Sequence, residues 1–145
     1  MMNPYAINAS ENKASKGLVV GFWIFTALFC LEMAFTAYYE LRVMPAAAEA
    51  FTRLGFSASS FRVELSWAKV AGVAALLVPM VPARIKEWAY AGFAINLVSA
   101  LIAHLSIGDR PRALAPSAIT SVLWGLSYFF WRRLHTRPLE AADRS

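Results

Sequence analysis

The stretch LVVGFWIFTALFCLEMAFTAYY, residues Leu18–Tyr39, decides the fold class of this chain. At 1.5 Å of rise per residue it spans about 33 Å as a helix, enough to cross a hydrocarbon core of about 30 Å. It is too long for the apolar part of a cleaved signal peptide, and the residues before it are polar. The sequence therefore predicts a membrane-spanning helix that stays in the mature protein.

Three further stretches have the length and apolar character of membrane spans: Val63–Val81, Trp88–Ile107 and Ala113–Trp131. The composition agrees, because 59% of residues are hydrophobic and 16% are charged, against about 45–50% and about 25% in soluble domains. We therefore expect an all-α fold, a four-helix transmembrane bundle over residues 17–133. Residues 1–16 and 134–145 are expected to be cytoplasmic tails.

The longest predicted loop contains a short helical segment, PAAAEAFTRL. Pro45 suits a first helical position and Gly55 suits the residue just past a helix end. We expect a short interfacial helix here, between the first and second spans, with Phe51 and Leu54 facing lipid or the bundle.

The basic residues indicate how the chain sits in the bilayer. Four spans place both termini on one side, which carries eight Lys and Arg residues against five on the other. The positive-inside rule then places both termini in the cytoplasm. The formal charge of +5 is spread beside apolar blocks and forms no patch, so we expect contact with anionic lipids and no nucleic-acid partner.

Three ionisable side chains fall at one predicted depth on three different spans. Counted from the inner face, Glu32 and Lys69 lie at about 21 Å and His104 at about 24 Å. Asp109 follows just beyond, and Asn96 shares the helical face of His104 and extends it toward mid-membrane. Charges at such depth are costly unless they are paired or face a cavity. We therefore expect a polar pocket formed by Glu32, Lys69, Asn96, His104 and Asp109.

Several roles fit this pocket. A Glu32–Lys69 ion pair, with His104 donating to Glu32, would only join the helices. A cavity would bind a polar-headed, lipid-like molecule such as a quinone, and a proton-carrying path is a third reading. A small membrane enzyme, an isomerase or oxidoreductase, would use Glu32 and His104 as an acid–base pair on an apolar substrate.

A second charged group lies near the predicted inner face. Arg84, Lys86 and Glu87 lie in and just after the loop between the second and third spans, where we expect contacts with lipid headgroups. With two histidines and one cysteine in the chain, we find no haem, metal or disulfide motif. The cofactor is therefore left open, with a quinone as the candidate.

The run from Trp67 to Asp109 resembles the DoxX-like family of bacterial membrane proteins. The resemblance rests on Lys69 and Gly72 followed by LLVP, on the stretch KEWAYAG from Lys86, and on His104 followed by Gly-Asp. It implies a compact four-helix membrane bundle in the bacterial inner membrane, linked in some members to membrane redox complexes. A redox subunit or a second copy of the chain would then be the partner beside the lipid bilayer. The resemblance supplies no catalytic residues.

Overall fold

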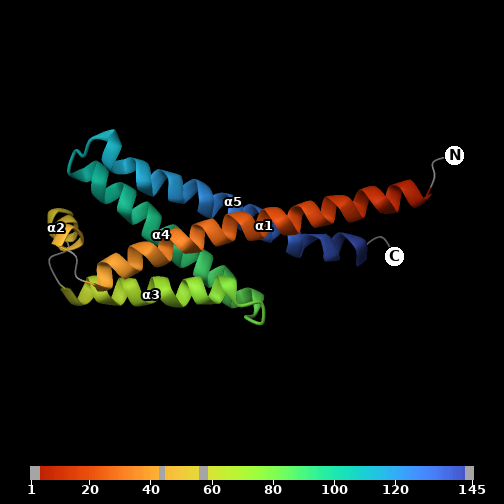
Figure 1. The fold of residues 1–145 in the computed structure, drawn as a ribbon, viewed down its shortest axis with the longest axis horizontal. Helices are drawn as coiled ribbons and strands as arrows, with labels where there is room; N and C mark the ends of the chain where they lie inside the picture. Colours follow the sequence, from red (N-terminus) through yellow and green to blue (C-terminus); the bar gives the residue numbers. More distant parts are fainter. Residues whose placement is uncertain (1–3, 43–44, 56–58, 143–145) are drawn as a thin grey trace.

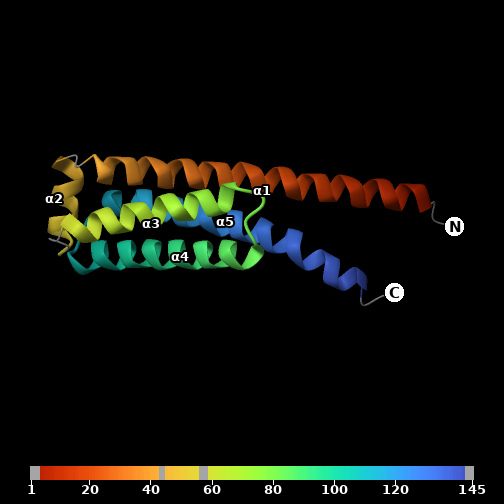
Figure 2. The ribbon, with the colours of Figure 1, turned by 90° about the horizontal axis from the view of Figure 1, so that it is seen from below.

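The computed structural model describes residues 4–42, 45–55 and 59–142, and within these ranges the chain is helical and has no strand. The helices are α1 (Pro4–Leu41), α2 (Pro45–Arg53), α3 (Ser59–Leu77), α4 (Ala83–Ser106) and α5 (Pro111–Ala142). Four of them run lengthwise, and the short α2 lies across one end, which we call the α2 end (Figure 1; Figure 2). The predicted all-α fold is confirmed.

The four long helices form a bundle in which each packs mainly against two others. Helix α1 packs against α3 and α5, and α4 packs against the same two helices. In the core the ring of Phe29 meets that of Phe93 edge to face, with 5.0 Å between centroids. Gly72 lets α3 and α4 approach, since a β carbon there would lie 2.7 Å from Cζ of Phe93. Small residues commonly allow such close packing between membrane helices.

Three helices in the described part of the chain are long and apolar enough to cross a membrane: Ser15–Leu41, Ala83–Ser106 and Pro111–His135. Helix α3 falls outside this group and carries Arg62, Glu64 and Lys69 within its length. Large apolar side chains cover the outer surface, and such an exposed apolar surface is typical of contact with lipid. The predicted number of four spans stays a prediction.

Both ends of the described chain are helical where the sequence suggested tails. Helix α1 begins at Pro4 and α5 continues to Ala142, so residues 4–16 and 134–142 extend the long helices. Figure 2 shows both extensions leaving the bundle at the end opposite α2. With 38 residues, α1 is about 57 Å long, nearly twice a hydrocarbon core of about 30 Å. The remainder of the two predicted tails lies outside the described residues.

Three buried hydroxyl groups join three helices. The Ser127 hydroxyl of α5 lies 2.7 Å from that of Thr26 in α1 and 2.7 Å from that of Tyr90 in α4. The indole nitrogen of Trp124 also donates to the carbonyl oxygen of Tyr90, at 3.0 Å. Because each hydroxyl can both donate and accept, the three groups satisfy one another in an apolar interior.

Candidate functional site

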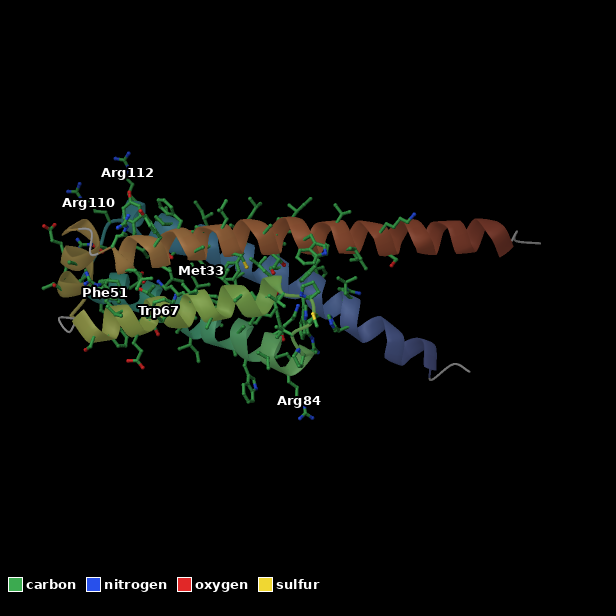
Figure 3. The ribbon with its side chains drawn as sticks, turned by 60° about the horizontal axis from the view of Figure 1, so that its bottom comes forward. Met33, Phe51, Trp67, Arg84, Arg110 and Arg112 are labelled. Atoms are coloured by element: carbon green, nitrogen blue, oxygen red, sulfur yellow. The ribbon has the colours of Figure 1, made fainter. Side chains whose placement is uncertain are left out.

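A cavity of about 510 Å³ lies inside the bundle near the α2 end. Phe51 and Leu54 of α2 line it, and Figure 3 shows Phe51 at that end of the molecule. Its polar lining comes from all four long helices: Glu32, Thr36 and Glu40 in α1, Lys69 in α3, Asn96, Ser99 and His104 in α4, and Ser117 and Thr120 in α5. Four of the predicted pocket residues thus line one space.

Lys69 is paired with a carboxylate that the sequence reasoning missed. Its ammonium nitrogen lies 2.6 Å from Oε1 of Glu40, and both side chains are about nine-tenths buried. The hydroxyl of Ser66 donates to the other carboxylate oxygen of Glu40, at 2.8 Å. The suggested Glu32–Lys69 ion pair is therefore replaced by Glu40–Lys69, because Glu40 at the end of α1 faces α3.

Glu32 is held by α5. Its carboxylate accepts a hydrogen bond from the hydroxyl of Thr120, which also contacts the carbonyl oxygen of Pro116. Among the described residues Glu32 has no basic partner within ion-pair distance. A carboxylate at the cavity wall with a single hydroxyl partner keeps acceptor lone pairs for a ligand.

His104 is bound to Asp109 and not to Glu32 as suggested. Its Nδ1 lies 2.6 Å from Oδ2 of Asp109, which also accepts from the guanidinium of Arg53 at 2.7 Å. Gly108 makes this contact possible, because its φ of +68° ends α4 in a left-handed turn that brings Asp109 back to the helix. The hydrogen bond from His104, together with the charge of nearby Arg53, lowers the pKa of Asp109 below its ordinary value.

Helix α4 turns one polar face toward the cavity. Asn96, Ala100 and His104, one helical turn apart, all line the cavity, and Ser99 lies beside them. Spacing of i, i+4 and i+8 puts such residues on one side of a helix. Asp109 sits at the rim through its bond to His104 and is not itself in the lining.

The predicted headgroup contacts divide into two kinds. Arg84 is exposed, at the opposite end of the bundle from Arg110 and Arg112 (Figure 3). Glu87 is half-exposed and lies 3.6 Å from Arg132. Lys86 differs from the prediction, because it is buried and directs its ammonium group at the carbonyl oxygen of Leu76, 3.4 Å away. There its positive charge interacts favourably with the carbonyl oxygens in the last turn of α3, which have no hydrogen-bond donor within the helix.

Sequence signals existed for part of what was missed. Glu40 follows Glu32 and Thr36 at intervals of four, so the three side chains share one face of α1. Thr120 of α5 and Arg53 of α2 carry no comparable pattern, since depth and spacing do not tell which neighbouring helix a side chain meets. Among the described residues, no group of three or more His, Cys, Asp or Glu side chains could hold a metal.

The residues that line the cavity lie within a segment that is similar to a known protein family. A family model described as the DoxX-like family matches residues 24–126, a segment that contains every residue lining the cavity. No curated protein and no solved structure matches the chain.

Proposed function

The chain belongs to the DoxX-like family, and from this premise we propose that it is a four-span protein of the bacterial inner membrane that binds a quinone-like molecule in its cavity. The family and the apolar helices fit a multi-pass membrane protein. Helix α3 serves as the fourth span, because Arg62 and Lys69 turn inward and Lys69 is paired with Glu40. Both termini are cytoplasmic, and α2 is the interfacial helix at the outer side.

The observation that carries this proposal is the mixed lining of the cavity. Hydrogen-bond donors from two helices, Lys69 of α3 and Asn96 of α4, face a space with apolar walls that include Leu65 and Leu97. A quinone head offers two carbonyl oxygens that accept hydrogen bonds and an apolar ring that fills the remaining volume. Apolar pockets with a few convergent polar groups are the usual form of small-molecule sites.

In a cell, this binding would serve a membrane redox system. The chain would act as an accessory or ligand-binding component beside a redox subunit or a second copy of itself.

Binding to the purified protein tests the proposal. A benzoquinone with a decyl tail is titrated into the protein in lipid nanodiscs, and quenching of tryptophan fluorescence reports binding. Asn96→Leu removes an amide donor from the cavity lining, and it should weaken binding at least about tenfold, the value of one good hydrogen bond. Glu64→Gln, an exposed change on α3 outside the cavity, is the control and should bind normally. Unchanged binding in Asn96→Leu would reject the proposal.

A second function, an acid–base enzyme, is favoured by one specific contact. Asp109 binds Nδ1 of His104 at 2.6 Å, and a histidine oriented in this way has its other nitrogen available for proton transfer. Glu32 lines the same cavity as the second acid–base group. In this reading the protein is an isomerase or oxidoreductase that acts on an apolar lipid. A lipid that co-purifies with the protein should then be converted to product, and mass spectrometry would detect that product. Loss of conversion in Glu32→Gln with binding retained would favour this function.

A further inference from the structure

A second hollow lies on the outside of the bundle, between α1 and α5. It measures about 900 Å³ and is walled almost entirely by apolar side chains. Helix α1 contributes Leu28, Leu31, Glu32 and Phe35, and helix α5 contributes Arg112, Ala115, Pro116, Ile119 and Leu123. We call this hollow the α1/α5 groove. Leu31 is 70% exposed and Ile119 62% exposed, so the groove opens on the surface that faces lipid.

The α1/α5 groove adjoins the internal cavity. Glu32 and Pro116 line both spaces, so these two residues form the boundary between them. Pro116 has no amide hydrogen, so α5 lacks the helical hydrogen bond to the carbonyl of Arg112 at this point. The boundary between groove and cavity is therefore formed by the Glu32 side chain, bonded to the Thr120 hydroxyl, and by the turn of α5 at Pro116.

The opposite face of the bundle carries a smaller hollow, which also adjoins the cavity. A hollow of about 380 Å³ lies between α3 and α4. There the ring of Phe93 packs directly on Gly72, with its Cζ 2.7 Å from the position of a β carbon at that glycine. This hollow shares the polar residues Lys69 and Asn96 with the cavity. The apolar α1/α5 groove is the larger of the two and the better match for a hydrocarbon chain.

We propose that the α1/α5 groove holds the apolar tail of the ligand whose polar head occupies the cavity, a proposal that rests on the proposed function. The ligand reaches the cavity sideways from the bilayer, between α1 and α5, past Glu32 and Pro116. From Arg112 to Leu123 the groove follows α5 for about 16 Å, so an extended tail lies along the helix. The ligand class is a polar ring with one flexible apolar tail.

The test compares two alanines on the same helix. Ala115 and Ala118 are both exposed, but Ala115 lines the groove and Ala118 lines none of the three hollows. Ala115→Phe places an aromatic ring in the groove, and Ala118→Phe adds the same ring to the lipid-facing surface. Association rates are measured in nanodiscs for a benzoquinone with a decyl tail and for the same benzoquinone without the tail.

The proposal expects one particular pattern. Ala115→Phe should slow association of the tailed quinone at least about tenfold and change the tail-less quinone less than about twofold, whereas Ala118→Phe should match the parent protein with both. Equal association rates in the two variants, with normal quinone binding, would overturn the assignment of the groove as the tail site. The proposed function would be unaffected. Failure of the parent protein to bind either quinone would overturn the proposed function and the tail site with it.

Discussion

Removal of the Glu40 carboxylate should destabilise the bundle more than removal of a half-exposed charge such as Glu87. The Lys69 ammonium lies 2.6 Å from Glu40, and the two side chains are 8% and 11% exposed. Glu40→Gln leaves the Lys69 cation buried without a counter-charge. Loss of one partner from a buried ion pair typically costs about 3–5 kcal/mol, so we expect the free energy of unfolding to fall by about that amount.

Titration with dodecyl sulfate from a mild detergent, followed by circular dichroism, measures this free energy. The double variant Glu40→Gln with Lys69→Met should recover most of the loss, because no unpaired charge is left in the interior. Ser66, which donates to Glu40, keeps a second acceptor in the carbonyl oxygen of Arg62 at 2.8 Å.

Glu87→Gln provides the control for charge removal itself. It breaks a half-exposed pair with Arg132 at 3.6 Å, and such pairs contribute about 0–1 kcal/mol. If Glu40→Gln cost no more than Glu87→Gln, or if the double variant were less stable than either single one, the reasoning about burial would be refuted.

Two further predictions concern packing and pH. Gly72→Ala should lower the free energy of unfolding by about 1–3 kcal/mol, because the new methyl would meet the ring of Phe93, whereas Gly92→Ala, with open space around it, should cost nothing in the same detergent titration. The lowered pKa of Asp109 means that its bond to His104 stabilises the fold above pH 3.8, its ordinary pKa, and that this stability is lost as pH falls through the lowered value. Asp109→Asn should remove that part of the acid sensitivity, and an unchanged pH profile of unfolding in this variant would contradict the assignment.

The sequence predicted the helices better than the contacts between them. Hydrophobic length placed the long helices, and Pro45, Gly55 and Gly108 marked ends that the structure confirms. The depth count brought Glu32, Lys69 and His104 to one level, and all three line one cavity. Depth measures position along the bilayer normal, so it carries no information on the direction in which each side chain points.

The partners that were missed follow from this limit. Glu40 falls outside the predicted span Leu18–Tyr39 because the apolar run ends at Tyr39, yet α1 continues through it to Leu41. Its position in the last turn of the helix directs it at α3 and Lys69, while Glu32, two turns earlier, meets Thr120 of α5. The helical tails were missed because polar composition alone does not separate an extended helix from a coil.

The junction of Thr26, Tyr90 and Ser127 has a consequence for a membrane protein exposed to a voltage across the bilayer. An electric field across the bilayer does work on charges, at about 2.3 kcal/mol per elementary charge for each 100 mV. These hydroxyl groups carry no net charge, and either member of each bonded pair can be the donor. The three helices that meet there are thus joined by a contact on which voltage exerts no net force, and which tolerates reversal of its hydrogen-bond direction.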